Sequence, residues 1–285
     1  MRVTKSSLAA LAVLIGGALT TPSFAAGDAV HIDRQTWSFS GFTGQFDQAQ
    51  LQRGFQVYKD ICASCHGLER VRFRNLFEPG GPEFDEEAVK ALAAEWPNQI
   101  TDGPDDQGKM FERPALQSDP IRGPFKNDNE ARAINNGALP PDLSLIAKAR
   151  NTHYTGTWWA HPFSMLRDIV TGYQEGGADY LYALLTGYQP APEGFQLAEG
   201  MLYNAAFPGH QFAMPEMLSK DSFVTYQDGT GSLDQNARDV AAFLSWSADP
   251  SLNERKRIGW LVVLYLIVTT GLLYAGKRRI WAKAH

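Results

Sequence analysis

The amino-acid sequence predicts a mainly α-helical domain that is exported across a membrane and anchored to it by one C-terminal helix. Three observations carry this prediction. A short apolar run follows two basic residues at the N-terminus, 19 residues near the C-terminus carry no charge, and amphipathic helical patterns flank the part between them. The chain has 285 residues, of which 44% are hydrophobic and 20% charged, as in folded proteins rather than disordered ones.

Residues 1–25 have the features of a secretory signal peptide. Arg2 and Lys5 form a basic start, a twelve-residue apolar run covers 8–19, and Ser23-Phe24-Ala25 is a small-x-small motif, with cleavage after Ala25 or Ala26. Twelve residues are too few to cross a bilayer as a helix, which argues against a first transmembrane helix. The length is typical of a bacterial signal, because a mitochondrial presequence is expected to be longer and richer in Arg.

Residues 258–276 predict a transmembrane helix within a C-terminal anchor region, residues 254–285. These 19 uncharged residues span about 28 Å as a helix at ~1.5 Å per residue, close to the ~30 Å hydrocarbon core. Three basic residues stand on each side, and Trp260, Tyr274 and Trp281 lie where interfacial aromatic residues are expected, which disfavours a buried helix of a soluble protein. Export of the N-terminus then places residues 26–253 on the periplasmic side of a bacterial inner membrane.

The predicted body is strongly acidic. The formal net charge of the chain is −5, but the signal segment carries +2 and residues 254–285 carry +6, which leaves −13 on the body. Residues 69–130, expected to form surface loops around one helix at 84–96, hold 14 acidic and 8 basic residues. This charge excludes a general nucleic-acid binder and favours encounter with a basic protein partner.

The chain has two cysteines, Cys62 and Cys65, and His66 follows at once. A disulfide between residues three apart closes too short a loop to stabilise much, so the pair indicates chemistry. A zinc site needs further ligands at short spacing, and a thioredoxin-like dithiol should begin a helix, whereas these cysteines end a helical pattern. The string Cys-x-x-Cys-His is the attachment signature of a c-type haem, with His66 as the proximal iron ligand. One motif predicts one covalently attached haem c.

Two amphipathic helices frame this motif. The first begins after Asp47, a good N-cap, and its apolar residues recur at helical spacing up to Ile61. Gly54 lies on it and predicts a close crossing with a second helix at 234–247. Crossed N- and C-terminal helices beside a haem describe a class I cytochrome c-like domain, here with long loop insertions and one C-terminal transmembrane helix.

A six-coordinate haem needs a second axial ligand. Met214 is the preferred candidate, because it lies in a turn-rich stretch with Pro208, Gly209 and Pro215 about twenty residues before the last helix of the body. Thioether ligation favours the reduced iron and raises its potential. The alternatives that stay open are His210, Met201, Met217 and an open position.

Several stretches together make the chain resemble the cytochrome c1 family, the c-type haem subunits of the quinol–cytochrome c oxidoreductase (cytochrome bc1) complex. The most particular stretch is 135–144, Asn-Asn-Gly-Ala-Leu-Pro-Pro-Asp-Leu-Ser, together with the single C-terminal anchor. The resemblance extends from about residue 37 to the C-terminus. The other matching stretches are 46–58, 62–67, 147–150, 179–188, 203–209 and 213–215.

The resemblance implies a role for individual residues. Cys62 and Cys65 attach the haem, and His66 and Met214 ligate its iron. Arg150 is implied to lie near a haem propionate, to which a guanidinium is well suited. Pro141 and Tyr180 are implied to line the haem pocket. The turn at residues 142–144 is expected only to begin a helix, with Asp142 capping residues 145–149.

The implied function is one-electron transfer in respiratory or photosynthetic electron transport. The electron comes from a Rieske iron–sulfur partner and goes to a cytochrome c, with cytochrome b as a further subunit and no bond-making chemistry in this chain. The nearest alternative is the haem c subunit of another membrane oxidase or dehydrogenase. A peroxidase-like enzyme normally needs a second haem, and a gas sensor needs a signalling domain.

Two features depart from the family pattern. Residues 151–176, with Trp158 and Trp159, separate Arg150 from the helix of Tyr180 more than expected, and the body lacks any cysteine beyond the haem pair. Residues 37–46, rich in aromatic side chains, predict either a strand packed on the body or a contact with a neighbouring subunit.

Overall fold

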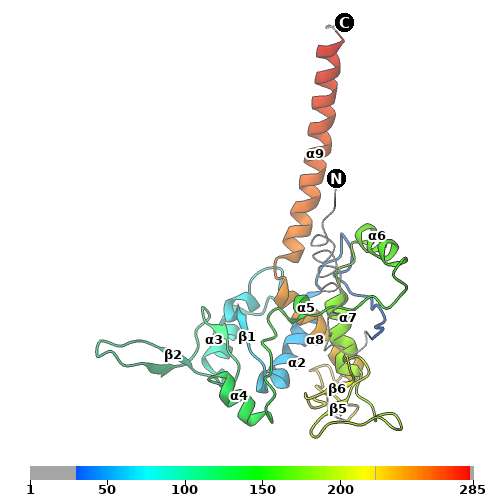
Figure 1. Ribbon diagram of the computed structural model, residues 1–285. Helices are drawn as coiled ribbons and strands as arrows, with labels where there is room; N and C mark the ends of the chain where they lie inside the picture. The colour runs from blue at the N-terminus through cyan, green and yellow to red at the C-terminus, as the bar shows by residue number, and fades with distance from the viewer. Residues whose placement is uncertain (1–29, 222, 283–285) are drawn as a thin grey trace, which may run out of the picture.

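The computed structural model describes residues 30–221 and 223–282. A helical body carries one long helix, α9 (Leu252–Trp281), which projects away from it (Figure 1). The predicted mainly α-helical architecture with one C-terminal apolar helix is confirmed. The predicted signal peptide lies outside the described residues and stays a prediction.

The elements of the body alternate helices with very short strands, which pair only in twos. They follow in the order α2 (Gln48–Asp60), η1 (Cys62–Ser64), β1 (Leu68–Arg72), η2 (Phe73–Leu76), α3 (Glu86–Ala94), β2 (Ile100–Asp102), β3 (Phe111–Arg113), β4 (Pro120–Ile121), α4 (Asp128–Ile134), α5 (Ile146–Ala149), α6 (His161–Thr171), α7 (Gly176–Thr186), β5 (Leu202–Tyr203), β6 (Gln211–Phe212) and α8 (Leu233–Ala248).

The crossing of α2 and α8 forms the centre of the body, as the sequence predicts. Asp47 begins α2, and its carboxylate accepts a hydrogen bond from the amide of Ala49. Gly54 allows the close approach, because a Cβ atom there would lie 2.1 Å from the carbonyl oxygen of Asp239 and 2.7 Å from Cβ of Phe243. Beside the crossing, Arg53 forms an ion pair of 2.8 Å with the buried carboxylate of Asp239. The two helices are therefore fixed by a steric fit and by a charge pair.

Residues 69–130 hold more core than the sequence predicts. The expected helix at 84–96 is α3, shorter by two residues at each end. The expectation of surface loops around it is only partly right, because Phe73 and Trp96 are buried with ring centroids 5.5 Å apart, and Ile121 pairs with Leu68 across the β1–β4 ladder. The β2–β3 hairpin extends away from the body (Figure 1).

The aromatic segment 37–46 packs on the body as a series of turns rather than as a strand. Trp37, Phe39 and Phe46 are buried in the core. Trp37 stacks on Phe39 with ring centroids 5.6 Å apart, and Phe39 meets Phe46 at a tilt with centroids 4.7 Å apart. The indole nitrogen of Trp37 donates a hydrogen bond of 2.7 Å to the buried carboxylate of Asp179 on α7. Phe42, in contrast, is half exposed.

Helix α9 is longer than the predicted span of 258–276 and joins the body through an ion-pair cluster. Among the described residues it is the one helix that is long and apolar enough to cross a membrane. At its base, the largely buried carboxylate of Asp249 accepts two hydrogen bonds from Arg255, at 2.6 and 2.7 Å, and one from Lys148, at 2.8 Å. This cluster sets the direction in which α9 leaves the body.

Candidate haem-binding site

The Cys-x-x-Cys-His motif folds as a tight turn directly after α2. The amides of Cys65 and His66 both donate hydrogen bonds to the carbonyl of Cys62, at 3.1 and 2.9 Å, and Cys62 begins the 3-10 helix η1. Both thiols are free and partly buried. Burial raises the pKa of the Cys62 thiol to about 12. The turn therefore presents two thiols and one imidazole from five consecutive residues.

His66 is held in one orientation by Pro141. The carbonyl oxygen of Pro141 lies 2.7 Å from Nδ1 of His66, and because a carbonyl can only accept, Nδ1 carries the proton. Burial lowers the pKa of His66, which favours the neutral imidazole. Nε2 is then the unprotonated nitrogen, as a metal-ligating histidine requires. Tyr58, near the end of α2, donates a hydrogen bond of 3.0 Å to the His66 carbonyl.

The loop 135–144 is fastened to the strand that follows the motif. The amide of Leu143 donates to the carbonyl of Gly67, and Asp142 accepts from the amides of Glu69 and Ser144. The prediction that Asp142 caps residues 145–149 is wrong, because α5 begins at Ile146 with Leu145 as its N-cap and no side-chain cap. The carboxylate of Asp142 instead ties the loop to β1 and so places the Pro141 carbonyl beside His66.

Met214 lies on the loop that follows β6, and its backbone is held from α7. The hydroxyl of Tyr188, just after α7, donates a hydrogen bond of 2.9 Å to the carbonyl of Met214. Tyr188 was part of the resemblance but had no assigned role, and only the structure reveals this contact. The alternative ligand His210 is engaged in the hairpin turn, where Nδ1 lies 3.1 Å from the carbonyl of Asn204 and the ring stacks on Tyr203. Met214 therefore stays the predicted second ligand, with His210 as an alternative.

Arg150 and Tyr180 come together where α5 packs against α7. A Cβ atom at Gly177 would lie 1.7 Å from the carbonyl oxygen of Ala147, so the glycine permits the close contact of the two helices. Tyr180 is buried on α7, and Arg150 is the exposed residue that ends α5. Burial raises the pKa of Tyr180 and the positive charge of Arg150 opposes this rise. The Arg150 guanidinium is thus placed next to a buried phenol and accessible to an anionic group.

The residues present fit a covalently bound haem. Two free thiols three residues apart match two thioether bonds, and a neutral imidazole with a free Nε2 matches the proximal position. In Figure 1, both α4 and the β5–β6 hairpin, which leads into the Met214 loop, lie at the end of the body remote from α9. The exposed Arg150 could supply a cation for a propionate.

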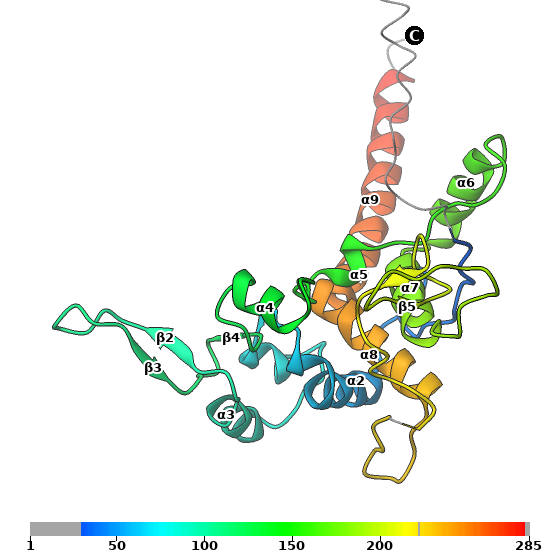
Figure 2. The ribbon, with the colours of Figure 1, turned by 60° about the horizontal axis from the view of Figure 1, so that its bottom comes forward.

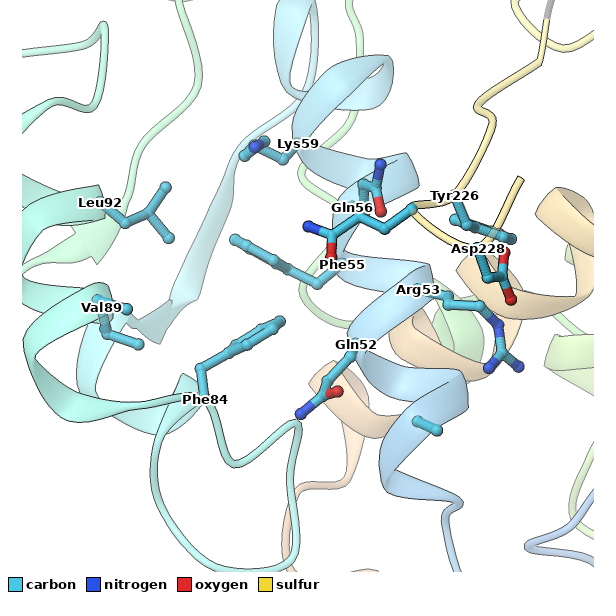
Figure 3. Close-up of a pocket in the computed structure, with 13 residues that line it drawn as sticks. Gln52, Arg53, Phe55, Gln56, Lys59, Phe84, Val89, Leu92, Tyr226 and Asp228 are labelled. Carbon is cyan, nitrogen blue, oxygen red and sulfur yellow. The ribbon is translucent and has the colours of Figure 1, made fainter. Parts of the chain in front are cut away.

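A separate cavity of about 620 Å³ lies between α2, α3 and the turn at Tyr226 (Figure 3). Phe55 and Phe84 face each other there, with ring centroids 5.5 Å apart, and Gln52 and Lys59 lie along its rim. None of the predicted site residues lines this cavity. The predicted haem-binding residues therefore lie outside this cavity.

Comparison with known proteins identifies the family. Residues 37–284 match the model of the cytochrome C1 family. The chain is 45% identical to cytochrome c1 of Blastochloris viridis and 41% identical to cytochrome c1 of Rhodospirillum rubrum, covering 97% and 94% of those proteins and 99% and 96% of this chain. It is also 47% identical, over 87% of its length, to the protein named cytochrome b/c1 of Bradyrhizobium diazoefficiens, of which it spans 35%. The chain therefore belongs to the cytochrome c1 family and is a membrane-anchored, haem-containing electron-transfer subunit of the cytochrome bc1 complex.

Proposed function

We propose that the chain holds one haem c, attached through Cys62 and Cys65 and ligated by His66 and Met214, and passes single electrons through it. The bound haem supplies one redox centre that takes up and releases one electron at a time. The observation that carries the proposal is the hydrogen bond from His66 Nδ1 to the Pro141 carbonyl, because it leaves Nε2 unprotonated for the iron.

The chain's own residues set the properties of this centre. The Pro141 carbonyl orients the His66 ring and makes the imidazole a stronger ligand. Pro141 itself would line the haem pocket. Tyr188 holds the Met214 backbone, and the thioether of Met214 favours the reduced state. Arg150 neutralises a propionate, and Tyr180 closes the pocket beside it.

The electron passes from a Rieske iron–sulfur partner to a cytochrome c, and cytochrome b is a further subunit. The name of the Bradyrhizobium relative joins cytochrome b and c1, which supports cytochrome b as a partner of this chain. The chain carries out no bond-making step itself, because quinol oxidation takes place in the other subunits. The acidic body, at −13, supports a basic acceptor. The second candidate, a subunit of another membrane oxidase or dehydrogenase, shares the haem motif but not the family stretches.

The proposed order along the chain is a signal peptide, a haem domain and a membrane anchor. Residues 1–25 form a cleaved signal peptide, residues 26–253 form the haem domain on the periplasmic side of the bacterial inner membrane, and residues 254–285 form the anchor with a short cytoplasmic tail. The apolar helix α9 and the bacterial relatives support this arrangement.

Purification from membranes in mild detergent tests the function. We expect a b-type cytochrome and a Rieske protein to co-purify, and the haem to stay with the denatured polypeptide of this chain. The ferrous spectrum should be low-spin and unchanged by carbon monoxide. A colourless protein, or rapid carbon monoxide binding by the native form, contradicts the proposal, and co-purification with different oxidase subunits favours the second candidate.

A further inference from the structure

Helix α6 turns a row of large apolar side chains outward. Five such side chains lie on α6 and two lie just before its first residue, and each of the seven is between 54% and 87% exposed. A surface helix of a soluble domain normally does the opposite and buries its apolar face. The seven residues are Trp158, Trp159, Phe163, Met165, Leu166, Ile169 and Val170.

Two polar side chains of α6 face the protein and two hydroxyls bond within the helix, whereas His161 and Arg167 are exposed. Ser164 and Asp168, one turn apart, are the partly buried positions of the helix, and Asp168 accepts a hydrogen bond of 2.7 Å from Arg34. The hydroxyls of Ser164 and Thr171 bond to carbonyls of their own helix. The outward face of α6 is thus mostly apolar, with Arg167 as an exposed charge, and it suits an apolar environment bordered by polar groups.

The segment 37–46 fixes α6 relative to the base of α9. The ammonium of Lys256, two residues before the apolar span, donates hydrogen bonds of 2.7 and 3.0 Å to the carbonyls of Phe39 and Gly44. At the other side of the same segment, Phe42 covers Gly172, the C-cap of α6, where an added Cβ atom would meet its ring at 3.2 Å. Both views show α6 on the side of the body from which α9 leaves (Figures 1 and 2).

We propose that α6, with Trp158 and Trp159, is a second membrane contact and lies in the interface of the bilayer that α9 spans, with its apolar face toward the acyl chains. A short amphipathic helix with bulky apolar residues on one face binds a bilayer surface in this way. Tryptophan is enriched at the interface between membrane and water. Lys256 and Arg257 precede the apolar span of α9 and therefore mark the level of the lipid headgroups, beside the segment 37–46 that holds α6. The inference rests on the proposed anchoring by α9, with which this surface is continuous.

Spin labels on the full-length, haem-loaded protein test this contact. Single cysteines are introduced as Phe163→Cys and Ile169→Cys on α6, Leu266→Cys on α9 and Gln107→Cys at the tip of the β2–β3 hairpin. Cys62 and Cys65 are the chain's two cysteines and are consumed by the haem, so only the new thiol reacts. Each protein is placed in vesicles of phosphatidylethanolamine and phosphatidylglycerol, and the label's accessibility to oxygen and to a water-soluble nickel chelate is measured.

We expect labels at residues 163 and 169 to resemble the α9 label, with a ratio of oxygen to nickel accessibility severalfold above that at residue 107. Nickel access at 163 and 169 equal to that at 107 overturns the proposal and leaves the anchor intact if the α9 label stays lipid-exposed. Labels that are open to nickel in the isolated chain and shielded only in the assembled complex also overturn it, because the face then meets another subunit. If the label at residue 266 is open to nickel, the result contradicts both the anchoring by α9 and the membrane contact of α6.

Discussion

The hydroxyl of Tyr188 donates a hydrogen bond of 2.9 Å to the main-chain carbonyl of Met214, 26 residues further along the chain. Burial raises the pKa of Tyr188, so the hydroxyl keeps its proton and remains a donor at neutral pH. The Met214 loop follows a hairpin of only two residue pairs and has little regular structure of its own. Tyr188 therefore holds the backbone of the proposed ligand Met214.

Replacing this donor should weaken thioether ligation without removing it. We expect Tyr188→Phe to lose about 1 kcal/mol of loop stabilisation, so that the ferric thioether absorption band disappears at lower pH and lower temperature than in the native protein. The matched control is Tyr182→Phe on α7, which loses a hydrogen bond of 2.5 Å to Asp234 away from this loop. If both variants change the band equally, Tyr188 acts only through general stability.

Replacing the thioether itself should open the iron. Met214→Leu keeps an apolar side chain of similar volume, so the fold should change little. We expect the ferrous variant to bind carbon monoxide and its reduction potential to fall by a large margin, because the ligand that favours reduced iron is gone. Met217→Leu, three residues further along, is the control and should leave both properties unchanged. An unchanged potential in Met214→Leu would assign the ligand to another residue.

The crossing of α2 and α8 predicts a strong steric effect at Gly54. We expect Gly54→Ala to destabilise the body by about 1–3 kcal/mol, since its Cβ would lie 2.1 Å from the Asp239 carbonyl oxygen. The intrinsic preference of Ala for a helix, about 0.5–1 kcal/mol, is too small to compensate. Thermal unfolding in detergent measures the change. Gly259→Ala on α9, which has open space around it, is the control, and equal melting temperatures of the two variants would contradict this packing.

The joint at the base of α9 predicts a pH dependence. Burial alone would raise the pKa of Asp249, but hydrogen bonds and charges of Arg255 and Lys148 outweigh it and lower the pKa below its usual value. The carboxylate therefore stabilises the fold above its ordinary pKa of about 4, and this contribution disappears as the pH falls through the lowered value.

We expect Asp249→Asn to cost about 1–2 kcal/mol at pH 7, less than a fully buried pair because both cations are half exposed. The difference from the native protein should shrink as the solution is acidified below the ordinary pKa. Urea unfolding at neutral and acidic pH measures it. Glu254→Gln removes an exposed carboxylate paired with Arg257 and should have almost no effect. A constant difference at all pH values would mean that ionisation of Asp249 is not the cause.

Local patterns predicted the parts of the structure that depend on nearby residues. The haem motif, the two crossing helices, the close approach at Gly54 and the apolar anchor each follow from spacing within one segment. The role of Asp142 was missed because its partner on β1, Glu69, lies 73 positions away, and its position before a helix suggested a cap. Residues 37–46 gave a strand-like alternation, but contacts with Asp179 and Lys256 hold them in turns.

The acidic body predicts a strong dependence of electron transfer on ionic strength. Its charge of −13 includes exposed acids such as Glu86 and Glu87 at the start of α3 and Asp105 and Asp106 on the β2–β3 hairpin. Such a field speeds the encounter with a basic partner, and salt screens it over about 10 Å at 0.1 M. We expect the second-order rate constant for reduction of a basic cytochrome c to fall steeply from low to high salt. The control is oxidation by a small uncharged acceptor, which should respond weakly, and a cytochrome c rate that is indifferent to salt would mean that the acidic surface does not guide the encounter.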